Sequence, residues 1–174
     1  MAQTDTKKYT VQEKLNKMDV DLISLTPGTT TEACSDGEII FNGEEITNVV
    51  SVPGGACILQ SIVILDDDDN GGAMDLIFYD TVSGTPSTDF GTEGSAITVD
   101  DDSSSIPGSI LGVIRVSDHM DGINWQLGHK ENCGLVLKAA SGSTSIYVAA
   151  VNRSGGALTW TASGLHFKFG VVKD

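Results

Sequence analysis

Short segments in which apolar and polar residues alternate recur along most of this chain, and turns rich in glycine, proline and aspartate separate them. In the segment 165–172, for example, Leu165, Phe167 and Phe169 share one face, whereas His166 and Lys168 share the other. A period of two is that of a β-strand with one buried and one exposed face. We therefore expect about ten short strands, at residues 19–25, 39–41, 46–52, 56–65, 74–79, 97–99, 110–116, 135–138, 146–151, 158–162 and 165–172.

This pattern predicts an all-β protein. Because the strands do not alternate with helical segments, we expect an antiparallel β-sandwich or barrel and not a parallel α/β sheet. A chain of 174 residues is long enough for one domain with its own core. We place that domain at residues 21–174, after an N-terminal arm at residues 1–20.

The segment 146–151 is unusual because it is apolar on both faces. Its alternating sets are Ile146, Val148 and Ala150 on one face and Tyr147, Ala149 and Val151 on the other. Such a strand fits either a buried position or an interface with a second subunit. Together with the apolar residues 49–52, it predicts self-association through apolar strand faces.

The first 20 residues differ in charge from the rest of the chain. They contain four lysines and three acidic residues, a net charge of +1, whereas residues 21–174 contain six basic and 21 acidic residues, a net charge of −15. Residues 10–13 have the spacing of a capping box, which predicts a short helix at residues 11–17. A helix this short needs a surface to pack on. We expect a neighbouring protein to provide it, with the chain's own domain as the alternative. The residues expected to make the contact are Lys7, Lys8, Val11, Lys14, Leu15, Lys17 and Met18.

Four consecutive aspartates at residues 66–69 raise the question of a metal site. Asp66, Asp68, Asn70 and Gly71 match the first half of a calcium-binding loop, in which carboxylate and amide oxygens coordinate the ion. The twelfth position of such a loop is a bidentate Glu, and here it is Ile77 within an apolar segment. Aspartate, asparagine and glycine are also the usual residues of a solvated turn. We favour a solvated hairpin turn and keep a calcium site at Asp66, Asp68 and Asn70 as the alternative.

The other side chains do not form a pattern that indicates catalysis. The histidines, His119, His129 and His166, lack the paired spacing of zinc ligands, and the chain has neither a G-x-S-x-G motif nor a phosphate-binding loop. Three cysteines are dispersed along the chain, which favours reduced thiols. We therefore expect a protein without enzymatic activity and without a cofactor.

The net charge bounds the partners. A value of −14 argues against binding to nucleic acids or to anionic membranes. The N-terminus has no apolar core of a signal peptide, and no apolar segment approaches the roughly 20 residues that span a bilayer. We expect a protein made in a cytoplasm that contacts other proteins.

Three stretches form a recognisable set: ILQSIVILDDDDNGGAMDLIFYDT at residues 58–81, SILGVIRVSD at residues 109–118, and the closing segment 134–172. Together they resemble the small virion structural proteins of tailed bacteriophages, among which capsid decoration (cement) proteins have the clearest role. The similarity extends over residues 49–172. It implies a β-sandwich or jelly-roll subunit, usually a homotrimer, that binds the major capsid protein on the outside of an icosahedral head.

The resemblance implies no catalytic residues, and it weakens the calcium hypothesis because lysine often occupies the same turn in that family. The alternative function is a calcium-dependent carbohydrate-binding β-module of a phage tail or fibre, or a free lectin. A hydrolase on a β-scaffold ranks third.

Overall fold

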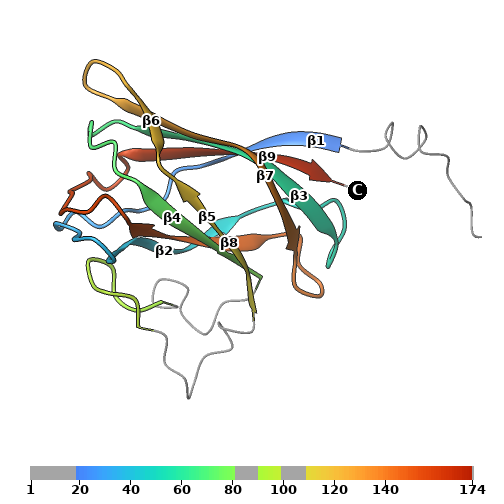
Figure 1. The fold of residues 1–174 in the computed structure, drawn as a ribbon. Coiled ribbons are helices and arrows are strands. Elements are labelled where there is room, and N and C mark those ends of the chain that lie inside the picture. The colour runs from blue at the N-terminus through green and yellow to red at the C-terminus, as the bar shows by residue number, and fades with distance from the viewer. Residues whose placement is uncertain (1–18, 81–89, 99–108, 174) are drawn as a thin grey trace, which may run out of the picture.

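The computed structural model describes residues 19–80, 90–98 and 109–173, which form two antiparallel β-sheets packed face to face (Figure 1). The five-stranded sheet has the order β1-β9-β3-β7-β6, and the four-stranded sheet has the order β2-β8-β4-β5. The strands are β1 (Asp19–Leu25), β2 (Ile39–Ile46), β3 (Ala56–Asp66), β4 (Met74–Tyr79), β5 (Ile110–Val116), β6 (Asp118–Asp121), β7 (Gln126–Lys138), β8 (Ile146–Asn152) and β9 (Leu165–Lys173). The prediction of an all-β antiparallel sandwich is confirmed.

The main core lies between the two sheets. Phe167 and Phe169, which the alternation in β9 places on one face, are each 1% exposed. The ring of Phe167 meets Phe41 of β2 edge to face at 5.5 Å, and the ring of Phe169 meets Phe78 of β4 edge to face at 5.9 Å. These aromatic pairs, an arrangement that adds to the stability given by burial alone, join the two sheets.

A second, smaller apolar cluster covers the outer face of the four-stranded sheet. It contains Ile39, Ile77, Tyr79, Phe90, Ala149 and Val151. Phe90 belongs to the segment 90–98, which lies below β2 in Figure 1, and its ring is 5.2 Å from that of Tyr79. The two-sided apolar pattern of β8 therefore reflects a buried position between β2 and β4. Of the two positions that the pattern left open, the structure selects the interior of the chain.

Several predictions of individual strands are wrong. The segment 46–52 does not form a strand, because β2 ends at Ile46 and a turn follows, in which Asn48 has a positive φ of 56°. The segment 158–162 provides a single bridge, between Leu158 and Cys34. Residues 97–98 are not in a strand either. In each case the apolar side chains are used for packing without a continuous backbone ladder.

The strand β6 and the first half of β7 were not predicted, because residues 118–134 are mostly polar. Backbone pairing makes a strand here. His129 of β7 pairs with Val63 of β3 on one side and with Asp118 of β6 on the other. Pairing with an apolar neighbour outweighs the weak strand propensity of these residues.

The predicted helix at residues 11–17 lies outside the described residues. The strand β1 begins at Asp19, so that Asp19 and Val20 belong to the sheet and not to the arm. No helix in the described part of the chain is long and apolar enough to cross a membrane.

Candidate functional site

The acidic turn connects the two sheets. The strand before it, β3, lies in the five-stranded sheet, and the strand after it, β4, lies in the four-stranded sheet. The prediction of a hairpin turn is therefore wrong, because β3 and β4 are not neighbours in one sheet. The physical reason is that each strand has better partners elsewhere: β3 pairs with β7 and β9, and β4 pairs with β5 and β8.

Asp66 is the buried anchor of this turn and is 2% exposed. Its Oδ1 accepts a hydrogen bond from the backbone N–H of Asp68 at 3.0 Å. Its Oδ2 accepts one from the backbone N–H of Gly71 at 3.1 Å and one from the indole Nε1 of Trp160 at 3.3 Å. Burial raises the pKa of this carboxyl, and the three N–H donors oppose that shift. The expectation of a solvated turn is wrong for Asp66.

The residues that follow Asp66 attach the turn to the segment before β9. The Oδ2 of Asp68 accepts hydrogen bonds from the backbone N–H of Thr161 at 2.7 Å and from its hydroxyl at 3.1 Å. The Nδ2 of Asn70 donates to the carbonyl of Thr159 at 2.9 Å. These contacts cross 89 to 93 residues of sequence, so the acidic turn ties together segments that are distant in the chain.

The three side chains predicted as calcium ligands therefore bind three different groups of the protein: Asp66 binds Trp160 and the turn backbone, Asp68 binds Thr161, and Asn70 binds Thr159. Within residues 19–80, 90–98 and 109–173, no group of three or more His, Cys, Asp or Glu side chains is placed to hold a metal ion. Calcium binding by this turn stays a prediction that a titration must test.

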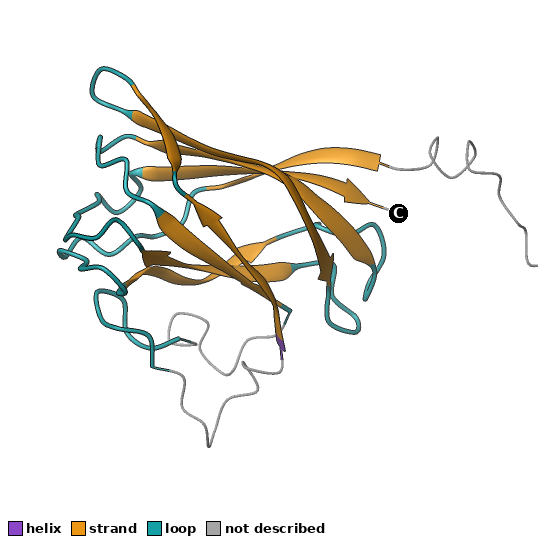
Figure 2. Cartoon of the chain, viewed as in Figure 1, coloured by secondary structure: helices purple, strands orange, loops and turns teal. Residues whose placement is uncertain are grey.

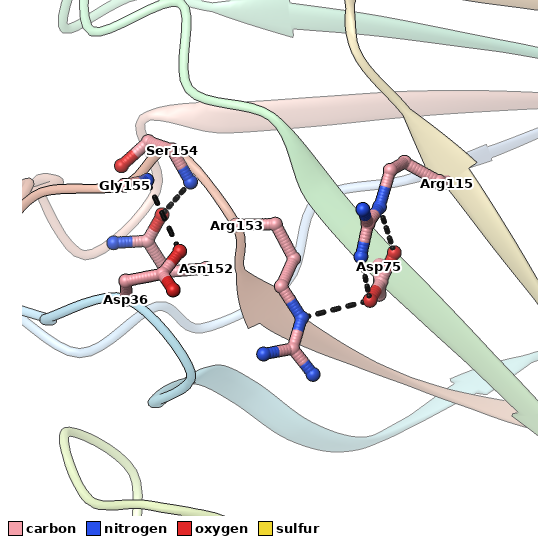
Figure 3. A network of polar contacts seen from close by, with 7 residues as sticks. All are labelled: Asp36, Asp75, Arg115, Asn152, Arg153, Ser154 and Gly155. Carbon is pink, nitrogen blue, oxygen red and sulfur yellow. Dashed lines mark hydrogen bonds and ion pairs between the residues drawn. The ribbon is translucent and has the colours of Figure 1, made fainter.

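A second polar cluster lies on the outer face of the four-stranded sheet (Figure 3). Arg115 of β5 donates two hydrogen bonds to the carboxylate of Asp75 of β4, from Nε to Oδ1 at 2.7 Å and from Nη2 to Oδ2 at 2.8 Å. Arg153, which follows β8, donates from Nε to Oδ2 of Asp75 at 2.8 Å. Hydrogen bonding by Arg115 lowers the pKa of Asp75, although burial opposes this shift. The cluster joins the end of β8 to β4 and β5.

Next to it, the buried amide of Asn152 holds the turn that follows β8. Its Nδ2 donates to the carbonyls of Cys34 and Gly156 at 2.7 and 2.8 Å, and its Oδ1 accepts from the N–H of Ser154 at 2.9 Å. Figure 3 shows Asp36 beside this turn, where it accepts from the N–H of Gly155. Both polar clusters connect neighbouring segments of the fold by hydrogen bonds, which is a structural role.

The five-stranded sheet presents a different kind of surface. We define its outer sheet face as the side chains that point away from the four-stranded sheet; Figure 2 shows this sheet as the upper layer. The backbone register aligns Val20 with Val172, Val172 with Ile58, and Ile58 with Val136. One row of β-branched apolar side chains therefore crosses β1, β9, β3 and β7. Val20 is 76% exposed and Val136 is 59% exposed.

A second row crosses the same face at its other end. It aligns His166, Leu65, Leu127 and Met120 on β9, β3, β7 and β6. Leu65, Leu127 and His166 are among the residues that line a hollow of about 350 Å³. Thr26 and Asp67 hold the two ring nitrogens of His166, each at 3.0 Å. The orientation of the ring is thus set from both sides.

The strand β1 has apolar side chains on both faces. Ile23 and Leu25 pack against the main core, whereas Val20 and Leu22 point outward, and Leu22 is 57% exposed. Asp21 lies on the inner side, where its Oδ2 accepts from the ammonium of Lys173 at 2.8 Å. Lys173 is buried and also donates to the carbonyl of Asn48. This ion pair, in which the Asp21 side chain is 48% exposed, joins the inner side of β1 to β9, while Val20 and Leu22 stay on the outer side.

Sequence reasoning missed the outer sheet face and the bond from Trp160 to Asp66. The face could have been suspected from the extra apolar residues Ile58 and Val136, which lie between the buried positions of β3 and β7. The residues predicted to bind a partner lie outside the described residues; they are Lys7, Lys8, Val11, Lys14, Leu15, Lys17 and Met18. Cys34, Cys57 and Cys133 form no disulfide.

Comparison of the chain with protein-family models, with curated proteins and with solved structures finds no match.

Proposed function

We propose that this chain is a non-enzymatic structural protein of the capsid decoration type, which binds the outside of a tailed-phage head and stabilises it. The observation on which the proposal depends is the outer sheet face, a broad surface with exposed Val20, Leu22 and Val136. Such a surface serves to bind another protein, since monomeric proteins rarely expose large contiguous apolar areas. The partners in this proposal are the major capsid protein and further copies of the chain itself, as a homotrimer.

The family resemblance supports the same role. The segments that carry it are the strands that build both sheets: residues 58–66 lie in β3, residues 74–79 form β4, and residues 109–118 contain β5. The acidic turn between β3 and β4, which the resemblance includes, acts here as a bridge between the two sheets. A charged turn is thereby given a structural role that needs no bound ion.

The charge of the chain supports a place on the outside of a particle. A net charge of −14 keeps a protein soluble and disfavours contact with nucleic acid, so the packaged genome is not its partner. The mildly basic arm at residues 1–18 is proposed to contact the acidic groups of a capsid neighbour, while its apolar residues Val11, Leu15 and Met18 pack into a groove. Charged groups at such a rim mainly affect the association rate and its salt dependence.

The direct test is to locate the protein on virions. An antibody raised against the purified chain is applied, with gold label, to particles of the phage that encodes it, and the particles are inspected by electron microscopy. We expect label on the outer surface of the heads and the protein in the mass spectrum of purified virions. Absence of the protein from purified virions, or label confined to the tails, would overturn the proposal.

A further inference from the structure

We infer that a second copy of this chain covers the outer sheet face. The inference rests on the proposed function, since it names the surface through which the structural subunit associates with itself. The sequence pattern pointed instead to the segment 146–151, which the structure buries inside the chain under Phe90. Among the described residues, a row of outward apolar side chains in register lies instead on the opposite sheet.

Apolar side chains lie in register across the outer sheet face. Val20, Ile58, Val136 and Val172 form a continuous row across four neighbouring strands. Leu22 lies beside the row and is 57% exposed. Apolar residues scattered singly on a surface need no explanation, but a row in register across a sheet is a contiguous patch, and such patches mark interaction sites. The other face of β1 packs Ile23 and Leu25 on the core and pairs Asp21 with Lys173, so Val20 and Leu22 are directed outward.

The outer sheet face differs in charge from the rest of the chain. Among the described strands, the outer sheet face has two basic side chains, Lys138 and Lys168, and two acidic ones, Asp118 and Glu131. Their strand partners, which share this face, are Ala56, Val63, His129 and Ser61, in that order. Its net charge is therefore zero with neutral histidines, although the chain has a net charge of −14. A copy of the chain that docks on this neutral face meets less repulsion than one that approaches the acidic surfaces.

The area of the outer sheet face is that of a standard protein–protein interface. Five strands with a spacing of about 4.8 Å and a mean length of about 30 Å give a face of roughly 700 Å². A stable protein–protein interface of standard size buries about 600 to 1,000 Å² on each partner. The face is thus large enough for a stable contact between two copies. A nucleic acid or an anionic membrane would require a clearly basic surface, which this face does not provide.

The test is the mass of the pure full-length protein in solution, measured by light scattering and by sedimentation equilibrium at about 1 to 50 µM, the range in which micromolar or tighter association is visible. We expect a mass of at least two copies of the 18.2 kDa chain. The variant Val136→Asp places a charge in the apolar row, and we expect it to weaken association at least about tenfold, equivalent to about 1.4 kcal/mol. A second variant, Val20→Asp, should act in the same direction.

The matched control is Val113→Asp. Val113 lies on β5 of the other sheet and is 52% exposed, close to the 59% of Val136. Both substitutions place Asp at an outward strand position of similar exposure, although β5 is an edge strand and β7 an inner strand, so the stability of each variant is measured directly. Melting followed by circular dichroism verifies that each variant is folded. We expect Val113→Asp to associate like the wild-type protein.

Three results would overturn the inference: a wild-type protein that stays monomeric over the whole range, a Val136→Asp variant that associates like the wild type, or equal losses in Val136→Asp and Val113→Asp. A fourth would assign the face to the chain's own arm: a monomeric full-length protein whose truncation at Asp19 makes it associate. The outcome is separable from that of the proposed function. A protein that associates but is missing from virions keeps the inference and removes the capsid role, and a monomer found on heads does the reverse.

Discussion

Replacing Asp66 by Asn, beside the same replacement of Asp68, tests whether the acidic turn is a structural bridge. Both residues belong to one run of four aspartates, but the structure gives them different environments. Asp66 is 2% exposed and accepts three hydrogen bonds from N–H donors. Asp68 is partly exposed, and a single oxygen accepts both bonds from Thr161.

The expected magnitudes follow from these contacts. In Asp66→Asn, one side-chain oxygen remains. The other oxygen is replaced by an NH2 group, which cannot accept the hydrogen bond of the N–H donor in front of it. One lost bond with its unsatisfied donor costs about 1 to 3 kcal/mol. The two bonds that remain lose the strength given by the charge, but the amide also removes a charge whose burial raises the pKa of Asp66, and this offsets part of the loss. We expect a loss of about 2 kcal/mol in the free energy of unfolding, or roughly 4 to 8 °C in Tm for a chain of this size.

Asp68→Asn can keep its bonds by turning its carbonyl oxygen toward Thr161, so we expect a loss below about 1 kcal/mol. Both free energies are measured by urea unfolding at one protein concentration, because self-association also contributes to stability. The reasoning is refuted if the two variants lose the same free energy, or if Asp66→Asn loses less than Asp68→Asn.

The same samples test the calcium alternative. Millimolar calcium and a chelator should leave the Tm of the wild-type protein equal, because the carboxylates are already bonded to N–H donors of the chain. A calcium-dependent rise of several degrees that disappears in Asp68→Asn would instead establish an ion site at the turn.

The remaining predictions concern three other parts of the chain. Asp75→Asn should cost about 1 to 2 kcal/mol near neutral pH, a value reduced for the solvent exposure of Arg115. The pKa of Asp75 is lowered from 3.8 in the folded state, so this contribution is present above pH 3.8 and is lost as the pH falls through the lower pKa. In urea unfolding, the difference in free energy between the wild type and Asp75→Asn should therefore disappear below pH 3.8. A difference that persists there contradicts the assignment. Gly164→Ala should lower the Tm, since a methyl group there would overlap the Asp68 carboxylate, whereas Gly156→Ala, with nothing within 4 Å, should not; equal melting of the two is the contrary outcome. A protein that starts at Asp19 should melt close to the wild type, because β1 begins there, yet lose its binding to heads; full occupancy in a particle-pelleting assay would remove the arm from the contact.

The sequence alone determined the fold class, because the period of two is a local property of the chain. In β9, for example, the same alternation that places Phe167 and Phe169 on one face makes them core residues in the structure. The segments 56–65, 74–79 and 110–116 were likewise predicted to within a residue or two. Where the local pattern was weak, as in residues 126–134 of β7, the strand depends on its neighbours and could not be predicted.

The tertiary structure decided which faces are buried and what the acidic turn does. Alternation tells which residues share a face, but not which face a second layer covers. The exposed Val20 and Leu22 of β1 and the doubly buried β8 are therefore consequences of how the strands pair and what packs on them. In the same way, the run of aspartates is typical of a turn. Asp66 is buried between the two sheets only because the folded chain places Trp160, 94 residues away in sequence, where its indole donates a hydrogen bond to Asp66. Long-range contacts of this kind depend on the whole fold, and for that reason a short stretch of sequence does not contain them.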